Sequence, residues 1–176
     1  MKAYDPNSTG SAALQIDVLL EIMIGRCKFG SFLDLCCGEM TVTREILPYV
    51  RSSLHIDVQD REFRPKQVAF VQADVLEILP AIVNRFDVAW CGDGLEHFRK
   101  DDGRDLLTLM EKAAKLPIIF TPLGDFEVEP RASDPDKHKS GWWPRDLEAR
   151  GWNTLAFPNW HPTLGIGAFF AWKEQE

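Results

Sequence analysis

The sequence predicts one α/β domain over residues 1–176, built on a mostly parallel seven-stranded sheet. Short apolar runs alternate with helical patterns along most of the chain, which is typical of β/α units. The stretch Ser31 to Thr41 (SFLDLCCGEMT) combines an apolar run, a turn at Gly38 and helix-compatible residues, so it predicts the first strand and turn of an open sheet. The last two apolar runs are joined by a spacer too short for a crossover helix, which predicts antiparallel neighbours.

The N-terminal half contains three predicted strands. Residues 1–10 are rich in turn formers and are expected to be flexible, and residues 11–26 have the apolar spacing of an amphipathic helix. Strands are predicted over 32–35, 54–58 and 68–72, and short helices over 41–47 and 75–83.

The C-terminal half completes the sheet. A strand over 86–91 precedes a helix that we expect Asp101 or Asp102 to cap and Pro117 to end. Strands over 117–121, 152–157 and 166–172 and a short helix over 144–150 follow. Only the seventh strand should run opposite to the first five. The connection 122–143 is long for a compact domain, and we interpret it as a lid-like loop.

The composition narrows the class of protein. An apolar fraction of 45% and a charged fraction of 27% are those of an ordinary globular domain, and a net charge of −7 argues against nucleic acid as a partner. The four cysteines have no spacing typical of a zinc site, which predicts a reduced, cytoplasmic protein without a metal. Asp17 and Glu21 interrupt the N-terminal apolar pattern, so we expect neither a signal peptide nor a membrane segment.

Acidic residues follow successive predicted strands. Asp57 ends the second strand, Asp74 follows the third and Asp93 follows the fourth. An acid about 20 residues after the first turn is where dinucleotide folds bind a ribose diol, which favours Asp57, with Asp60 as the fallback. Each acid also has a structural interpretation. Asp57 could be a solvated acid at a strand end, and Asp74 could be a helix N-cap.

The order of elements and these motifs resemble the class I S-adenosylmethionine-dependent methyltransferase family, over roughly Leu14 to the C-terminus. The family's D-x-G-x-G-x-G motif stands here as Asp34-Leu35-Cys36-Cys37-Gly38-Glu39-Met40, with only the middle glycine present. The resemblance implies a Rossmann-like three-layer α/β/α sandwich with strand order 3-2-1-4-5-7-6. Cys36 can replace a glycine if its φ is negative, and Met40 either packs on the first helix or narrows the pocket.

The resemblance also implies S-adenosyl-L-methionine as the cofactor. Asp57 would bind the ribose, Asp74 and the Val75 backbone N–H would bind the adenine, and Asp93 would face the sulfonium. The full set of implied cofactor-binding residues is Asp34, Cys36, Gly38, Met40, Asp57, Asp74, Val75 and Asp93.

Two further motifs suggest catalytic residues. Leu95-Glu96-His97 follows the fourth strand, and family members often carry a similar run there, which makes His97 a candidate general base and Glu96 a helix-start acid or a catalytic group. A hydrogen-bonded structural histidine is the alternative for His97. His55 and His161 carry no motif and are expected to be structural or surface residues.

The run His138-Lys139-Ser140-Gly141-Trp142 is similar to an H-x-S-G-W run in small bacterial methyltransferase-like proteins. The resemblance implies that His138 acts in catalysis and that Trp142 contacts the substrate. Alternatively, Trp142 and Trp143 fix the loop to the core.

The sequence therefore predicts methyl transfer, with a small molecule favoured as the acceptor, a protein possible and nucleic acid unlikely. A nicotinamide-dependent oxidoreductase is disfavoured because the turn lacks G-x-G-x-x-G. A non-catalytic module that binds S-adenosylmethionine, a nucleotide or a partner on the same fold is the alternative, since two motif glycines are missing.

Overall fold

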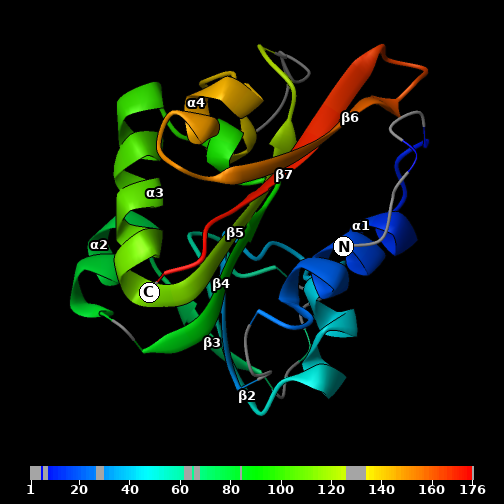
Figure 1. The fold of residues 1–176 in the computed structure, drawn as a ribbon. Helices are drawn as coiled ribbons and strands as arrows, with labels where there is room; N and C mark the ends of the chain where they lie inside the picture. The colour runs from blue at the N-terminus through cyan, green and yellow to red at the C-terminus, as the bar shows by residue number, and fades with distance from the viewer. Residues whose placement is uncertain are drawn as a thin grey trace.

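A seven-stranded sheet forms the centre of the molecule, in the order β3-β2-β1-β4-β5-β7-β6. The computed structural model of the 176-residue chain describes residues 5, 8–26, 30–61, 65, 68–83, 85–125 and 134–175. The strands are β1 (Ser31–Leu35), β2 (Ser52–Asp57), β3 (Ala69–Gln72), β4 (Phe86–Gly92), β5 (Ala114–Pro122), β6 (Asn153–His161) and β7 (Ile166–Trp172). Neighbouring strands from β3 to β5 are parallel, and β7 is antiparallel to both β5 and β6. The predicted strand order and directions are confirmed (Figure 1).

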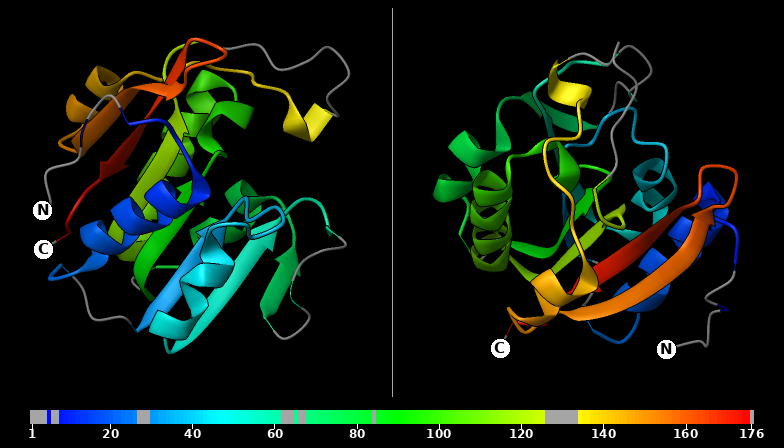
Figure 2. Two further views of the ribbon diagram at one scale, coloured as in Figure 1. Left: turned by 90° about the vertical axis from the view of Figure 1, so that its right-hand side faces the viewer. Right: turned by 90° about the horizontal axis from the view of Figure 1, so that it is seen from above.

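Helical segments cover both faces of this sheet. The α-helices are α1 (Ala12–Met23), α2 (Val75–Ile78), α3 (Lys100–Ala113) and α4 (Pro144–Glu148). The 3₁₀ turns are η1 (Thr43–Glu45), η2 (Leu47–Tyr49), η3 (Leu79–Ala81), η4 (Leu95–His97) and η5 (Asp134–Asp136). α2, α3 and α4 pack on one face, whereas α1 and the segment containing η1 and η2 pack on the other (Figures 1 and 2). The three predicted layers are therefore present.

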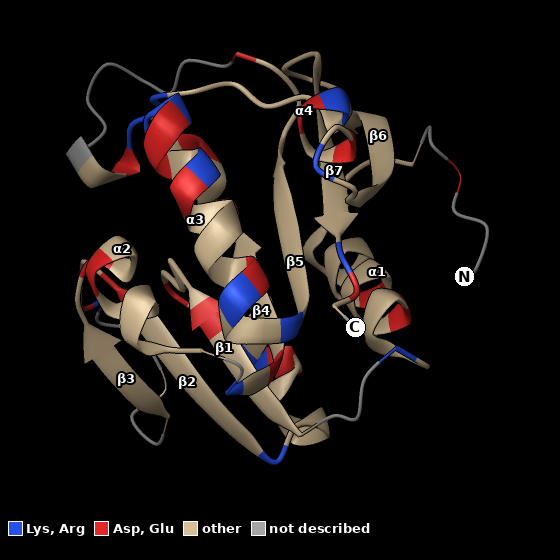
Figure 3. Ribbon diagram, turned by 60° about the vertical axis from the view of Figure 1, so that its left-hand side comes forward, with Lys and Arg blue, Asp and Glu red and all other residues tan. Residues whose placement is uncertain are grey.

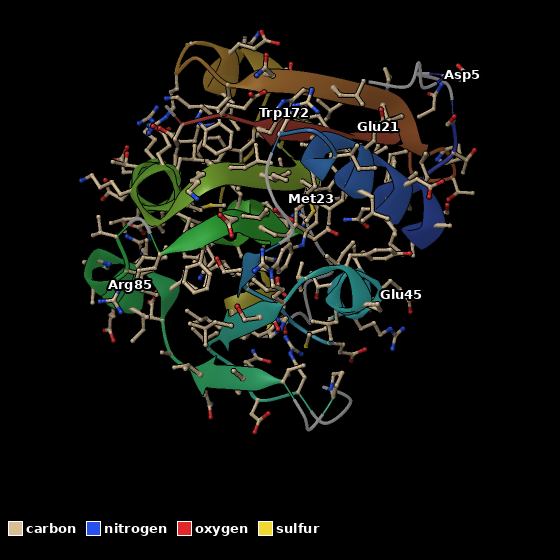
Figure 4. All side chains as sticks on the ribbon, turned by 60° about the horizontal axis from the view of Figure 1, so that its bottom comes forward. Asp5, Glu21, Met23, Glu45, Arg85 and Trp172 are labelled. Atoms are coloured by element: carbon tan, nitrogen blue, oxygen red, sulfur yellow. The ribbon has the colours of Figure 1, made fainter. Side chains whose placement is uncertain are left out.

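Each face of the sheet has its own apolar core. Because side chains alternate along a strand, Leu33 and Leu35 of β1 join the core under α2 and α3, and Phe32 joins the core under α1. Met23 of α1 and Trp172 of β7 belong to the second core, and Figure 4 labels both. Figure 3 shows that most charged residues lie on the helices and turns, whereas the central strands β1, β2, β4 and β5 each contain a single one.

Two element boundaries differ from those predicted. The predicted helix over 41–47 is replaced by the 3₁₀ turns η1 and η2, with Pro48 in the first turn of η2. Pro117 does not end α3, because α3 ends at Ala113 and Pro117 lies inside β5, paired with Ala89 of β4. A residue before proline is restricted to extended backbone, and here the extended conformation begins three residues earlier, at Ala114.

The strand predicted over 152–157 extends to His161 in β6, and the remaining differences are small. Arg99, not Asp101 or Asp102, is the N-cap of α3, and the two acids lie in its first turn, where the helix dipole favours negative charge. Within residues 1–10, which were expected to be flexible, residues 1–4 and 6–7 lie outside the described residues. None of the described helices has both the length and the hydrophobicity needed to cross a bilayer.

Candidate functional site

The turn after β1 keeps the backbone shape of an alternating-glycine motif although it has one glycine. Cys36, Gly38 and Met40 have φ values of 55°, 49° and 57°, all in the left-handed region that glycine adopts most readily. The condition under which Cys36 was expected to replace a glycine, a negative φ, is therefore not met. A Cβ placed on Gly38 would meet no heavy atom within 4 Å, so the space above this residue is open.

Asp57 connects this turn to the end of β2. Its Oδ2 accepts the backbone N–H of Gly38 at 2.9 Å, and its Oδ1 accepts the backbone N–H of Gln59 at 2.8 Å. The side chain is held in place by two amides and still faces a cavity. Asp57 is thus a fixed carboxylate beside the open space above Gly38.

A cavity of about 410 Å³ lies at this edge of the sheet, a volume typical of small-molecule sites. Six residues of the predicted cofactor set line it: Cys36, Gly38, Asp57, Asp74, Val75 and Asp93. A second cavity of about 220 Å³ adjoins it and shares Cys36, Gly38 and Asp93. The other two predicted residues, Asp34 and Met40, line this second cavity.

Met40 does not fill the space above Gly38. Its side chain is 2% exposed and packs into the protein interior, although it forms part of the wall of the smaller cavity. The backbone N–H of Met40 donates to the carbonyl of Cys37, and its carbonyl accepts from Arg44 N–H. The larger cavity therefore stays open despite the missing glycine.

Asp74 and Val75 form the wall of the cavity at the start of α2. Asp74 is the N-cap of this helix, and its Oδ1 accepts the backbone N–H of Leu76 at 2.8 Å. Its carboxylate remains exposed, so the capping role leaves one side of it open to the cavity. Val75 is the first residue of α2, where amide groups have no partner within the helix.

Asp34 has a different environment from the other acids. It is buried in β1, and its Oδ2 accepts from Thr43 Oγ1 at 2.7 Å and from His55 Nδ1 at 2.9 Å. The other ring nitrogen of His55 lies 2.9 Å from Ser53 Oγ. Burial raises the pKa of Asp34, and the His55 hydrogen bond opposes that rise. His55, for which the sequence suggested only an ordinary role, is the partner that holds this motif acid.

Asp93 lies where the two cavities meet. It has a left-handed backbone conformation (φ 49°), and its side chain is open to the cavities. Protein atoms surround it on the other sides, and this desolvation raises its pKa to about 6, whereas a hydrogen bond with Gln15 lowers it. Its charge therefore changes close to neutral pH.

Glu96, His97 and His138 come together at the side of the larger cavity. One candidate ligand or proton-accepting atom from each of them lies within 4.8 Å of the others, and the two imidazole rings meet edge to face at 5.1 Å. Glu96 is buried, and its Oε2 accepts from Thr121 Oγ1 at 2.9 Å. Desolvation, followed by the charge of Asp93, raises the pKa of Glu96 to about 8. His97 lines the cavity directly.

Trp142 takes the packing role and not the cavity-facing one. It is 1% exposed, belongs to the core under α3 and is absent from the lining of both cavities. Its Nε1 donates to Ser140 Oγ at 2.8 Å, and the Lys100 ammonium lies 3.6 Å from its ring centroid. Trp142 thereby anchors the described end of the 122–143 connection, and Trp143 remains 42% exposed.

Four residues that line the cavity were not predicted from the sequence. Arg61, Pro135, Asp136 and Lys139 line it from two connections, and Arg61 Nη2 lies 2.6 Å from Asp136 Oδ1. Figure 2 shows the segment around η5, in yellow, reaching towards the end of the sheet that carries β2. No local pattern pairs residues 61 and 136, because the contact depends on how two loops dock. Residues 126–133 of the predicted lid-like loop lie outside the described residues.

The chain resembles known proteins in its fold, whereas comparisons of its sequence find no match. No protein-family model matches the chain, and no curated protein matches its sequence. A SAM-dependent methyltransferase from Archaeoglobus fulgidus superposes with a TM-score of 0.64 at 16% identity, over 93% of this chain and 95% of the other. The N-methyltransferase NodS from Bradyrhizobium japonicum gives 0.67 at 13% identity, over 93% and 96%.

A third structure has a small molecule and a product of the cofactor bound. The Burkholderia thailandensis 1,6-didemethyltoxoflavin-N1-methyltransferase, with 1,6-didemethyltoxoflavin and S-adenosylhomocysteine, gives a TM-score of 0.65 at 18% identity, over 94% of this chain and 79% of the other. By its strand order and these superpositions, the chain has the Rossmann-like fold of the SAM-dependent methyltransferases.

Proposed function

We propose that the protein is a SAM-dependent methyltransferase that acts on a small-molecule acceptor. The observation that carries the proposal is Asp57, whose carboxylate is fixed by the Gly38 amide beside an open cavity. Asp74 and Val75 on one side and Asp93 on the other line the same cavity. The fold of the chain supports the same function.

The residues around the cavity fit an adenosyl-sulfonium compound. Asp57 would accept hydrogen bonds from the ribose hydroxyls, since each of its oxygens has a second lone pair besides the one that accepts from Gly38 or Gln59. Asp74 would accept from the adenine amino group while the Val75 N–H donates to the ring. Asp93 would face the positive sulfonium, where a negative charge is favourable. The bound cofactor would supply a methyl group made electrophilic by the sulfonium.

The protein's own contribution is to position the acceptor and to exclude water. Transfer needs the acceptor atom held in line with the methyl group, and a closed pocket excludes competing water. Pro135, Asp136 and His97 line the cavity, and Glu96 and His138 lie next to His97. We expect the acceptor, where it carries a proton, to lose it at this cluster.

The choice of a small-molecule acceptor rests on the volume of the cavity and on the net charge of the chain. A cavity of about 410 Å³ is suited to a cofactor and a small acceptor, and the acidic net charge disfavours nucleic acid. The Burkholderia neighbour, whose structure holds 1,6-didemethyltoxoflavin, supports this choice. A protein side chain is the second candidate. The proposal also includes a cytoplasmic location, on the cysteine pattern of the sequence.

Thermal unfolding with S-adenosylhomocysteine tests cofactor binding first. A ligand present at about 100 times its Kd stabilises a protein by about 2.7 kcal/mol, so a clear rise in Tm is expected. Incubation with methyl-labelled S-adenosylmethionine and pooled small-molecule extracts then tests transfer. Absence of any Tm shift at millimolar ligand would overturn the proposal.

One observation favours a non-catalytic binding module as the second candidate. Cys36 and Met40 occupy motif positions that are glycine in the family, and Met40 forms part of the wall of the smaller cavity. A module of this kind would show the Tm shift with S-adenosylhomocysteine but no label transfer to small-molecule or protein fractions.

A further inference from the structure

Three hydrogen bonds from one short segment hold His138 beside Glu96 and His97. The backbone N–H groups of Lys139 and Ser140 donate to the Glu96 carbonyl at 2.8 and 3.2 Å. On the other side of His138, the Lys137 carbonyl lies 3.2 Å from His97 Nδ1. The segment is therefore docked onto η4 on both sides of His138, and the three side chains meet in a prearranged geometry.

Two outer contacts of this cluster, at His97 and at Glu96, resemble those around metal ligands. A metal-bound histidine usually donates its other ring N–H to a carbonyl or carboxylate, and His97 Nδ1 has the Lys137 carbonyl as that partner. This contact leaves His97 Nε2 as the atom for an ion. Thr121 Oγ1 likewise donates to Glu96 Oε2 and leaves Oε1 on the side of His138.

The candidate ligand atoms lie within 4.8 Å of one another, which is wider than the spacing around a bound ion, so binding would draw them together. His138 Nε2 lies 3.9 Å from Glu96 Oε1, which is too far for a hydrogen bond. Tetrahedral ligands about 2.1 Å from Zn²⁺ lie about 3.4 Å apart, so a small side-chain movement would bring both atoms to bonding distance. A buried carboxylate such as Glu96 is also stabilised by coordination to a cation.

We propose that Glu96, His97 and His138 bind one divalent transition-metal ion, of which Zn²⁺ is the best match, at the side of the larger cavity. Two imidazoles and one carboxylate select transition metals over Mg²⁺ and Ca²⁺, which prefer oxygen ligands. Three protein ligands leave a coordination position open, as in catalytic zinc sites. The sequence did not predict a metal because position 138 lies far along the chain from 96 and 97.

The use of this ion in methyl transfer depends on the proposed function, whereas the binding of the ion does not. His97 lines the cavity, so an ion bound to it would lie at the cavity wall. A hydroxyl coordinated there would lose its proton more readily, as water does on zinc. In this arrangement the two imidazoles serve as ligands and not as bases.

The full chain, stripped of metal with a chelator, is titrated with Co²⁺, and the visible absorption of the bound ion is followed. Saturation at one ion per chain and displacement by Zn²⁺, but not by Mg²⁺, are expected. His97→Ala and His138→Ala should each remove the signal, and Thr121→Val should weaken binding by about tenfold. His161→Ala, which changes an exposed histidine on β6, is the matched control and should bind as the parent does.

Absence of a saturable signal would overturn the proposal, as would equal binding in the parent and in both histidine variants. Glu96→Gln keeps the size of the side chain and should weaken binding while the circular dichroism spectrum stays unchanged. The Tm shift with S-adenosylhomocysteine is measured on the same samples. A shift without Co²⁺ binding overturns only the metal site, and Co²⁺ binding without a shift overturns only the proposed function.

Discussion

The Asp57 carboxylate accepts the backbone N–H of Gly38 at 2.9 Å, and this contact joins the end of β2 to the turn after β1. It orients one oxygen of Asp57 and fixes the position of the turn beside the cavity that both residues line. The same side chain thus shapes the pocket and presents a charged acceptor to it. Substitutions at Asp57 should therefore affect both ligand binding and the stability of the turn.

Asp57→Asn should weaken binding of S-adenosylhomocysteine by about 2 kcal/mol, or about thirtyfold, because hydrogen bonds to a charged group contribute about that much. The amide keeps the size of the side chain but has one acceptor oxygen for the backbone N–H groups of Gly38 and Gln59, so Tm without ligand should also fall, and the affinity is measured well below the Tm of the variant. Isothermal titration calorimetry measures the affinity. Asp60→Asn, which changes the nearby acid absent from the cavity lining, is the control. Equal losses in the two variants would show that the ribose site is misplaced.

Asp57, Asp74 and Asp93 could be placed at one edge of the sheet from the sequence because β/α alternation is a local signal. The carboxyl ends of parallel strands lie at the same edge of the sheet, independently of the conformation of the loops. The turns η1 and η2 were not predictable in the same way. Residues 41–43 include two threonines and a valine, and β-branched residues favour helix only weakly, so packing decided the outcome.

The parts of the site that depend on contacts between loops could not be predicted from the sequence. The motifs of Glu96, His97 and His138 were each recognisable, but their meeting depends on backbone bonds between residues 139–140 and Glu96. Arg61 pairs with Asp136 for the same kind of reason. The backbone conformation of the turn could not be predicted either, because a cysteine at position 36 gives no indication of a positive φ.

Cys36→Gly and Met40→Gly should differ in stability although both remove a left-handed non-glycine residue. Glycine relieves strain of about 1–2 kcal/mol at each position, and its flexibility in the unfolded chain offsets about half of that. Cys36 is half-buried, so its variant should lie within about 1 kcal/mol of the parent. Met40 is 2% exposed, so its loss should cost about 2–4 kcal/mol. Urea unfolding measures both, and equal effects would contradict the packing role of Met40.

The preference for S-adenosylmethionine over S-adenosylhomocysteine should rise with pH between about pH 5 and pH 7. Asp93 has a pKa raised to about 6 by desolvation, so its carboxyl is neutral below that pH and ionised above it. Only the ionised form attracts the sulfonium, which S-adenosylhomocysteine lacks. The ratio of the two Kd values, measured by calorimetry, should change several-fold.

Asp93→Asn is the matched control for this pH effect, because asparagine tolerates the left-handed backbone at this position. The variant should show a flatter ratio over the same pH range. A pH dependence that is the same in the parent and in the variant would assign the effect to another group.

His55→Ala should destabilise the fold by about 3 kcal/mol, since it leaves the buried Asp34 carboxyl without its imidazole partner. His161→Ala changes an exposed histidine and should stay within about 0.5 kcal/mol of the parent. Chemical denaturation provides both values. A loss of cofactor affinity without a loss of stability in His55→Ala would instead indicate a direct binding role for the Asp34–His55 pair.

Asp136→Asn should speed the dissociation of S-adenosylhomocysteine by a few-fold without lowering the stability of the free protein. The Arg61–Asp136 pair joins two loops that line the cavity, but its side chains are 34% and 40% exposed. Exposed ion pairs contribute at most about 1 kcal/mol, so the folded state should tolerate the change. Stopped-flow displacement measures the dissociation rate. Asp101→Asn, which removes an exposed ion pair with Arg104 on α3, is the control, and a similar rate increase there would show that the Arg61–Asp136 pair does not close the site.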